Sequence, residues 1–294
     1  MKIAVTGANG FVARNLIALL LEDTGPRDIR ALVRDPRTAL RELPAADLDI
    51  VTADVTRADT LRGVFDGCEL VLHTVAVPTE RKAAFEAVNV RGTEHVVAEA
   101  LRAGVRRIVH LSAIGADSES PFPFLCSKGK GERAVTGSGI DHVALRPSIL
   151  FGKGDDFFPK LGFTLHFPVV PVPGDGSARF QPLHVDDLAL VLRAALNGSM
   201  TGVFEIGGPE VVTYDELLTE TMRGYRKRRP RLHLPVPLMK PAAVAMGLVM
   251  SDPPVTVAQL DLLKVDNVPA RNGIEQVFGI SPRPFRGGLA YLAA

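Results

Sequence analysis

The residues from Thr6 to Ala13 have the types and spacing of a phosphate-binding turn. A short apolar run precedes two glycines, and leucines and isoleucine then recur at helical spacing. A strand, a glycine turn and a helix in this order present free backbone N–H groups at a helix N-terminus, where anions bind. Gly7 permits the tight turn, and Gly10 lets a phosphate approach the backbone. This stretch predicts a site for the pyrophosphate of a dinucleotide, with an ordinary strand–helix turn as the alternative.

The end of the second predicted strand indicates which dinucleotide suits the site. An acidic residue there would accept hydrogen bonds from the ribose hydroxyls and repel a 2′-phosphate. The chain instead has Val33 followed by Arg34, and a guanidinium pairs well with a phosphate. Asp35 would reverse this preference if the strand ended later, but before Pro36 it is better placed to cap the next helix. We therefore expect NADP(H) to be favoured over NAD(H).

Apolar runs at regular intervals predict the strands that position this turn. They cover residues 3–5, 27–33, 48–51, 70–74, 107–111, 142–145 and 203–206. Helices are expected between them, including residues 60–65, residues 85–101 and a helix capped by Asp186–Asp187. Strands that are apolar throughout and alternate with helices favour an α/β fold, a Rossmann-type doubly wound parallel sheet. Ligands of such a sheet collect at the carboxyl ends of its strands.

The character of the chain changes after Pro147. Residues 157–176 are rich in Pro and Phe without clear periodicity, which predicts a loop-rich cover over a site. Thr213 to Glu216 form a capping box, and the remainder is expected to be helical, with Arg226–Arg229 as a solvated helix end or a partner site. We interpret residues 1–149 as an NAD(P)-binding core to which 185–206 return. Residues 150–184 and 207–294 then form a smaller C-terminal substrate-binding lid.

Composition excludes several classes of function. The formal net charge of +1 argues against a nucleic-acid partner. Cys68 and Cys126 are too few for a disulfide framework, and no signal peptide is apparent, so a cytoplasmic location is expected. Residues 236–250 form the longest apolar stretch, but prolines and Lys240 interrupt it and it is too short for a transmembrane segment. A lid, a dimer contact and a membrane-surface helix remain alternatives for this stretch, and its prolines favour the lid. No metal site is predicted.

Several motifs resemble the short-chain dehydrogenase/reductase superfamily in order and spacing. They are Thr6-Gly7-x-x-Gly10-x-x-Ala13, Asp54-Val55, Asn89-Val90-Arg91-Gly92-Thr93, Ser127-Lys128, Leu145-Arg146-Pro147 and His184-Val185-Asp186-Asp187. The longer strings at 31–36, 109–117, 179–187 and 206–210 resemble its atypical or extended branch. That branch includes the nucleotide-binding accessory subunit of mitochondrial complex I and its bacterial relatives. The resemblance extends to about Glu216 and becomes weaker beyond it.

The resemblance implies a catalytic pair on one helix. In active members a Tyr four residues before a Lys exchanges a proton with the substrate oxygen, while the Lys holds the cofactor ribose and lowers the pKa of the Tyr. Lys128 is present here, but Phe124 occupies the position of the Tyr and has no hydroxyl. The assisting Ser or Thr of the family falls near Ile114, two residues after Ser112. The cofactor half of the site is therefore expected to be intact and the usual proton donor to be missing.

The remaining cofactor contacts are placed by the strand ends and by the resemblance. Asp54 and Val55 are expected beside the adenine, and residues 74–76 beneath the cofactor. The full set of expected cofactor-binding residues is Thr6, Gly7, Asn9, Gly10, Phe11, Val12, Arg34, Asp54, Val55, Thr74, Val75, Ala76, Asn89, Leu111, Lys128, Pro147 and Ile149.

Three functions are compatible with these residues. The first is an NADP(H)-dependent oxidoreductase of non-standard mechanism that acts on a small apolar substrate beneath phenylalanines of residues 157–167. Without the Tyr, such an enzyme would suit a substrate that needs little protonation, such as an iminium or an activated alkene. Otherwise another side chain must donate the proton, and the candidates are Ser112, His110, His166 and His184. Cys126 is not a candidate, because it lies off the pocket face of its helix. The second is a non-catalytic NADPH-binding structural, assembly or sensor protein, and the third is an isomerase or cyclase with structural NADP. The chain is expected to associate with further copies of itself or with the subunits of a protein complex.

Overall fold

A computed structural model of the protein describes residues 1–23, 28–43, 47–78, 84–250 and 253–293. Its first half contains β1 (Ile3–Thr6), α1 (Phe11–Asp23), β2 (Ile29–Val33), α2 (Pro36–Glu42), β3 (Asp49–Thr52), α3 (Ala58–Leu61), β4 (Leu70–His73), η2 (Phe85–Arg91), α4 (Gly92–Arg102), β5 (Arg107–Leu111), α5 (Pro123–Thr136) and β6 (Asp141–Pro147). Its second half contains β7 (Leu150–Phe151), α6 (Phe157–Phe163), η3 (Thr164–His166), β8 (Val170–Pro173), β9 (Arg179–Phe180), β10 (Leu183–His184), α7 (Val185–Asn197), β11 (Gly202–Ile206), β12 (Val212–Thr213), α8 (Tyr214–Gly224), β13 (Arg231–Leu234), α9 (Val236–Val249), α10 (Val257–Leu262) and η4 (Ala290–Ala293).

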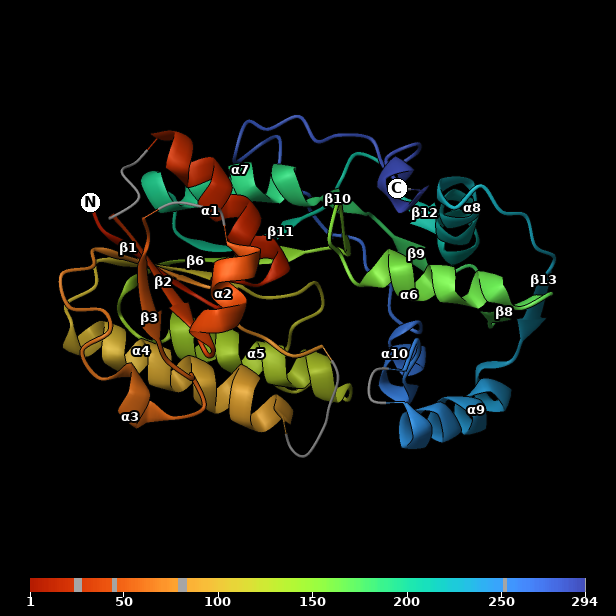
Figure 1. The fold of residues 1–294 in the computed structure, drawn as a ribbon, viewed down its shortest axis with the longest axis horizontal. Helices are drawn as coiled ribbons and strands as arrows, with labels where there is room; N and C mark the ends of the chain where they lie inside the picture. The colour runs from red at the N-terminus through yellow and green to blue at the C-terminus, as the bar shows by residue number, and fades with distance from the viewer. Residues whose placement is uncertain (24–27, 44–46, 79–83, 251–252, 294) are drawn as a thin grey trace.

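A seven-stranded sheet in the order β11-β6-β5-β4-β1-β2-β3 forms the centre of the larger part of the molecule. All six strand pairs in this sheet are parallel. The chain runs outwards from β1 to β3, returns to β4 on the other side and continues to β11, so the order reverses beside β1 (Figure 1). This reversal creates the crevice in which ligands of doubly wound sheets bind. The predicted Rossmann-type parallel sheet is confirmed.

The alternation of side chains along the strands divides the core into two layers. Val5, Leu72 and Val109 point to the face covered by α1 and α7, where they join one buried cluster. Their neighbours Ala4 and Val71 point to the opposite face, covered by α3, α4 and α5. Side chains two positions apart on a strand lie on the same face of the sheet. A polar residue two positions after Ala4 or Val71 must therefore lie beneath α4 and α5. This rule places the polar part of the candidate site.

The predicted strands are all present, with ends displaced by at most two residues, and β5 has the predicted bounds. The second begins at Ile29, and the proposed start at Arg27 lies outside the described residues. One helix prediction was wrong in extent, and a second was right in extent but has a π-helical first half. The helix expected over 60–65 is α3, which ends at Leu61 because the chain turns at Gly63 with a φ of +80°. The helix expected over 85–101 begins with the π-helical turns of η2 before α4 takes over.

A smaller part of the molecule packs around its own buried cluster, which includes Phe151, Phe158, Leu217 and Phe285. Residues 157–176 are not loop-rich as predicted, because they form α6, η3 and β8. Asp155 explains the helix: its carboxylate accepts a hydrogen bond of 2.8 Å from the Phe158 amide, and Pro159 falls in the first turn, where no amide donor is needed. No helix in the described ranges has the length and apolar character needed to cross a membrane.

Two further expectations about helix ends can be compared with the structure. Thr213 and Glu216 make the predicted capping box at the start of α8. The cap of α7 was predicted wrongly: His184 is the capping residue and accepts a hydrogen bond of 3.1 Å from the Asp186 amide through Nδ1. The acidic residues 186–187 instead occupy the first turn, where they still suit the helix dipole. Arg226–Arg229 are not helical, since α8 ends at Gly224 and the cluster lies in the connection to β13.

Candidate functional site

The turn between β1 and α1 has the backbone shape that the glycines predict. Gly7 has a φ of +65°, and a Cβ on it would lie 2.8 Å from Cγ2 of Val75. The Gly10 amide donates to the Gly7 carbonyl at 2.8 Å, and the first helical hydrogen bond runs from Arg14 to the Gly10 carbonyl. The amides at the very start of α1 therefore precede the helical ladder and face the end of the sheet. This cradle, which side chains at the glycines would fill, fits a pyrophosphate.

The residues that follow β2 and β3 lie beside this cradle. Arg34 is exposed directly after β2, and Asp35 caps α2 by accepting a hydrogen bond of 2.9 Å from the Arg37 amide, as predicted. Asp54 is half-buried and holds its own turn, accepting from the amide and hydroxyl of Thr56 at 2.9 and 2.8 Å. Arg34 thus has an exposed guanidinium at the position expected for the 2′-phosphate.

Other expected cofactor contacts have structural partners of their own. Asn9 donates from its side-chain amide to Glu42 at 3.0 Å, which links the glycine turn to α2. Val55 is buried, and its Cγ2 lies only 2.9 Å from the position of a Cβ on Gly92, so Gly92 lets α4 approach β3's end. Thr74 donates to the Thr6 carbonyl at 2.8 Å and fixes the end of β4 against β1.

A buried polar layer lies on the α4/α5 face at the ends of β1, β4 and β5. The Thr6 hydroxyl is 2.8 Å from Nδ1 of His73, and Nε2 of His73 is 3.1 Å from the Thr93 hydroxyl, which in turn donates to the Asn89 carbonyl at 2.8 Å. His73 is fully buried, and this burial, with the nearby Lys128 charge, lowers its pKa to about 3. The imidazole is therefore neutral and ties three elements together. The sequence reading did not single out this chain of contacts.

His110 lies next to His73 and has a different environment. The two rings stack with centroids 5.3 Å apart. His110 is 1% exposed, yet neither ring nitrogen has a hydrogen-bond partner among the described residues. Burial, followed by the charges of Lys128 and His73, holds its pKa well below the usual range. A buried neutral ring with two unsatisfied nitrogens is a poor proton donor at neutral pH.

Lys128 extends from α5 into this buried layer. Its side chain belongs to a residue only 4% exposed, and Nζ donates to the Leu111 carbonyl at 2.6 Å. Burial lowers the pKa of Lys128 to about 8, and the neighbouring carboxylate of Glu132 only partly opposes this shift. A surface lysine would show none of these features. The amine therefore lies at the carboxyl end of β5 with a pKa about one unit above neutral pH.

Glycines on α5 explain how Lys128 reaches so far inwards. A Cβ on Gly129 would lie 2.2 Å from the Asp117 backbone, and one on Gly131 would lie 2.4 Å from the Asn89 carbonyl. Side chains at these positions would push α5 away from η2 and from the loop after β5. The glycines of the Ser127–Glu132 string are therefore needed for the close packing that places the Lys128 amine. The sequence analysis did not predict this role.

Asn89 lies in η2, where the wider π-helical turn directs its amide towards the end of β4. The amide oxygen accepts from the Val77 backbone at 2.9 Å, and the amide nitrogen donates to the Val77 carbonyl and to the Ser127 hydroxyl at 3.2 and 2.9 Å. The π-helix is how the chain accommodates this residue, and such turns are frequent at functional sites. Asn89 therefore connects the loop after β4 to α5, next to Lys128.

Comparison with known proteins identifies the family. A family model described as NAD(P)H-binding matches residues 7–156. The protein is 31% identical over 225 residues to ceramide reductase of Caulobacter vibrioides, across 76% of this chain and 68% of that protein. It is 28% identical over 282 residues to mitochondrial NADH dehydrogenase [ubiquinone] 1 alpha subcomplex subunit 9 of Arabidopsis thaliana, across 90% of this chain and 68% of that one. The chain belongs to the NAD(P)H-binding family of short-chain dehydrogenases/reductases.

Solved structures agree on the fold. The NADPH-dependent quinone oxidoreductase QOR2 from Escherichia coli, complexed with NADPH, superposes with a TM-score of 0.77 at 20% identity over 100% of both chains. MoeE5 in complex with UDP-glucose and NAD superposes with a TM-score of 0.76, also at 20% identity, over 100% of this chain and 97% of that one. At this low identity the superpositions establish the shared Rossmann-type fold alone, and the sites must be compared residue by residue.

Phe124, where the resemblance leads us to expect the family's Tyr, makes an apolar contact. Phe124 lies one helical turn before Lys128 on α5, is half-buried and contacts the Phe85 ring with centroids 6.0 Å apart. Ser112 is 5% exposed and its hydroxyl has no hydrogen-bond partner among the described residues. Ile114, where the family's assisting hydroxyl was expected, is buried and apolar. Ser112 is thus the hydroxyl that remains free at the end of β5.

The other candidate acids have structural roles. His184 caps α7 and meets the Phe151 ring edge-to-face, with centroids 4.9 Å apart. His166 is exposed at the end of η3 and packs against Phe163 at 5.7 Å. Cys126 donates to the Ser118 carbonyl at 3.1 Å. Within the described ranges no group of His, Cys, Asp or Glu has the arrangement of a metal site.

The end of β6 is fixed by a residue that sequence reasoning missed. Asn267 accepts from the Ile149 amide through its side chain at 2.7 Å, and both its carbonyls accept from the Ser148 hydroxyl. Pro147, the last residue of β6, is buried. Asn267 therefore ties the expected cofactor contacts at 147–149 to the C-terminal part of the chain. Nothing in the sequence around Asn267 indicates this, because the contact spans more than a hundred residues.

Proposed function

We propose that this protein binds NADP(H) across the carboxyl ends of β1, β2, β4 and β5 and transfers hydride between it and a small apolar substrate. The observation that carries the proposal is Lys128, a lysine buried at the end of β5 with its pKa lowered to about 8. Burying such an amine costs folding free energy, and buried groups with shifted pKa values cluster at functional sites. Its place in the family's Ser-Lys string supports a role at the cofactor ribose.

Each part of the dinucleotide has a matching group in the proposal. The glycine turn and the first amides of α1 hold the pyrophosphate. Arg34 pairs with the 2′-phosphate, which gives the preference for NADP(H). Asp54 and Val55 lie beside the adenine, and Lys128 holds the nicotinamide ribose. Bound NADP(H) would supply or accept the hydride.

The site supplies few proton donors, which restricts the substrate. Phe124 cannot donate a proton, and the pKa values of His73 and His110 keep both rings neutral. The Ser112 hydroxyl and the Lys128 amine are the polar groups left at the end of β5. An activated alkene, a quinone or an iminium, each of which needs little protonation at the hydride step, suits this set best. Relatives named for ceramide and for a 3 beta-hydroxysteroid support an apolar substrate.

A second function rests on the same substitution at position 124. Since a general acid contributes about 10²- to 10⁴-fold to such reactions, Phe124 also supports a protein that retains NADPH without turning it over. The complex I subunit among the relatives supports this alternative.

Native mass spectrometry of the purified protein, followed by turnover assays, tests the proposal. We expect the protein to retain NADP(H) or to bind it readily. We also expect the absorbance of NADPH to fall when at least one quinone or activated alkene is added. A protein that holds NADPH through a broad panel of acceptors without oxidising it would support the binding function instead. A protein that takes up no dinucleotide would refute both.

A further inference from the structure

Helix α9 has its apolar side turned to the solvent. Its less exposed side includes Met239, Ala243 and Met246, and the helix packs against α10. The opposite side is exposed and apolar: it includes Leu238, Pro241, Ala242, Val244, Ala245, Leu248 and Val249. Leu248 and Val249 are 84% and 87% exposed. A solvent-facing stripe of this kind is the reverse of the pattern that a helix of a soluble domain shows.

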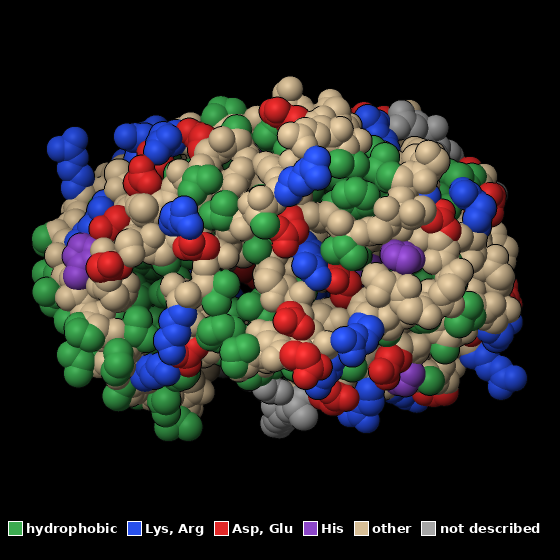
Figure 2. Space-filling model, turned by 180° about the vertical axis from the view of Figure 1, so that it is seen from behind, with side chains coloured by type: hydrophobic (Ala, Val, Ile, Leu, Met, Phe, Trp, Pro, Cys, Tyr) green, Lys and Arg blue, Asp and Glu red, His purple; other side chains and the backbone are tan. Residues whose placement is uncertain are grey.

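The exposed apolar surface continues beyond α9. Leu232 on β13 is 51% exposed, and Phe163, Phe167 and Val169 at the end of α6 are 40–48% exposed. These segments are neighbours because β13 pairs with β8. Figure 2 shows hydrophobic side chains gathered at the end of the molecule that carries α9, on its lower left in that view. We call these exposed residues of α9, β13 and the α6–β8 segment the apolar end-surface. Contiguous apolar surfaces of this kind mark interaction sites.

The segment of the chain that leads into the apolar end-surface is basic, although Lys240 within it pairs with Asp261 of α10 at 2.9 Å. Between Glu220 and Asp252 the sequence has no acidic residue, and its basic residues are Arg223, Arg226, Lys227, Arg228, Arg229, Arg231 and Lys240. The four consecutive basic residues lie in the connection from α8 to β13, at the same end of the molecule as α9 (Figure 1). No carboxylate in the described part of the chain pairs with any of these four.

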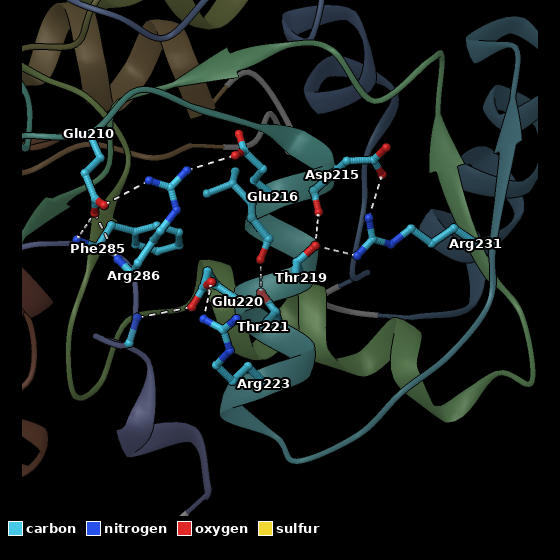
Figure 3. Close-up of polar contacts among 12 residues, drawn as sticks. Glu210, Asp215, Glu216, Thr219, Glu220, Thr221, Arg223, Arg231, Phe285 and Arg286 are labelled. Carbon is cyan, nitrogen blue, oxygen red and sulfur yellow. Dashed lines mark hydrogen bonds and ion pairs between the residues drawn. The ribbon is translucent and has the colours of Figure 1, made fainter.

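The nearby carboxylates pair with basic residues other than Arg226–Arg229. Glu216 pairs with Arg286 at 2.9 Å, Glu220 pairs with Arg223 at 2.6 Å, and Asp215 lies 3.5 Å from Arg231 and 2.9 Å from His233. Figure 3 shows these carboxylates directed to arginines on both sides of α8. Arg226–Arg229 therefore keep their positive charge uncompensated beside the apolar end-surface.

We propose that this end of the protein docks on an anionic membrane surface, with α9 lying in the plane of the lipid headgroups. Exposed aliphatic side chains next to unpaired Arg and Lys are the combination that interfacial helices use. The helix is too short to span a bilayer, which agrees with an interfacial position. A second copy of the chain fits the surface poorly, because two such basic segments would repel each other. The docking does not depend on the proposed enzymatic function.

Vesicle flotation with the full-length protein tests the docking. We expect the protein to float with phosphatidylcholine vesicles that contain phosphatidylglycerol, to bind pure phosphatidylcholine vesicles weakly, and to lose binding as salt rises. The double variant Leu248→Ser/Val249→Ser should reduce partitioning about tenfold, since both side chains would leave the acyl boundary. Arg228→Gln/Arg229→Gln should reduce binding to anionic vesicles by roughly fivefold for each charge removed.

Matched controls come from exposed residues at other sites. Leu101→Ser removes a 53% exposed leucine from α4, and Arg106→Gln removes an exposed charge before β5; neither should change vesicle binding. Absence of binding to anionic vesicles would overturn the proposal, as would equal losses in the control variants. Concentration-dependent self-association that Leu248→Ser/Val249→Ser abolishes, without vesicle binding, would identify a contact between copies. Binding to polyglutamate but not to vesicles would identify an acidic protein surface as the partner.

Discussion

Lys128 on α5 donates a hydrogen bond of 2.6 Å to the backbone carbonyl of Leu111, the last residue of β5. This contact carries the lysine amine through the buried polar layer to the carboxyl end of the sheet. The helix can approach closely enough only because positions 129 and 131 are glycines. The close packing of α5 on its neighbours is therefore what brings the Lys128 amine to the proposed cofactor site.

Replacing Lys128 with Met should separate stability from binding. The lowered pKa means that the folded protein holds fewer protons than the unfolded chain between pH about 8 and 10.5. Stability therefore rises with pH across this window, and the buried charge is unfavourable below it. We expect Lys128→Met to raise the free energy of unfolding at pH 7 by about 1–2 kcal/mol, after loss of the Leu111 hydrogen bond, and to flatten the alkaline dependence. Urea unfolding at several pH values measures both.

The same Lys128→Met variant should bind NADPH much more weakly, as calorimetry would show. An unchanged NADPH affinity would contradict the assigned role, whatever the change in stability. Lys130→Met is the matched control, because Lys130 is exposed on the same helix; it should alter neither quantity.

Arg34→Ala should discriminate between the two cofactors. A charge-assisted hydrogen bond to the 2′-phosphate is worth roughly 1.5–3 kcal/mol, so NADPH affinity should fall about ten- to hundredfold while NADH affinity changes little. Calorimetric titration with both nucleotides measures the difference. Arg106→Ala, at the amino end of the sheet, should leave both affinities unchanged. Equal losses of NADPH and NADH binding in Arg34→Ala would remove the preference for NADP(H).

Phe124→Tyr should add the missing proton donor. The new hydroxyl would lie one helical turn from Lys128, whose charge lowers the pKa of a neighbouring phenol. We expect ketone reduction, followed by NADPH absorbance, to appear or to rise by about 10²-fold. Phe122→Tyr adds a hydroxyl at the capping position of α5, off the Lys128 face, and should give no gain. No increase over a broad ketone panel would favour the non-catalytic function.

The two stacked histidines should respond oppositely to mutation. Both pKa values are lowered, so below the ordinary value of 6.5 the unfolded chain binds more protons than the folded protein. Stability is then lost as the pH falls, by about 1.4 kcal/mol per pH unit for each histidine. His110→Phe should remove one such contribution and raise stability at pH 5 by about 2 kcal/mol, because no hydrogen bond is lost.

His73→Phe is the contrasting variant. It would leave the buried hydroxyls of Thr6 and Thr93 without their imidazole partner, and should lower stability by roughly 2–4 kcal/mol at pH 7. Thermal and urea unfolding between pH 4 and pH 7 distinguish the two. If stability fell with pH as steeply in His110→Phe as in the wild type, the His110 ring would not be buried in its neutral form.

The sequence by itself determined the sheet, the glycine turn and the identity of the residues at the strand ends. Local patterns were sufficient because a buried parallel strand needs a continuous apolar run, and a turn that binds phosphate needs glycine where a Cβ would clash. The placement of Arg34 after β2, the cap at Asp35 and the box at Thr213 follow the same logic. Each depends on residues only a few positions apart.

Only the tertiary structure decided what lies between the helices and the sheet. The contacts of Lys128 with Leu111, of His73 with Thr6, and of Asn267 with Ser148 join residues 17, 67 and 119 positions apart. Their partners are set by which helix covers which face of the sheet, and no local pattern specifies that. The exposure of α9 is of the same kind. Its sequence shows an apolar segment, and the side that remains uncovered is known only once α10 is packed against the other.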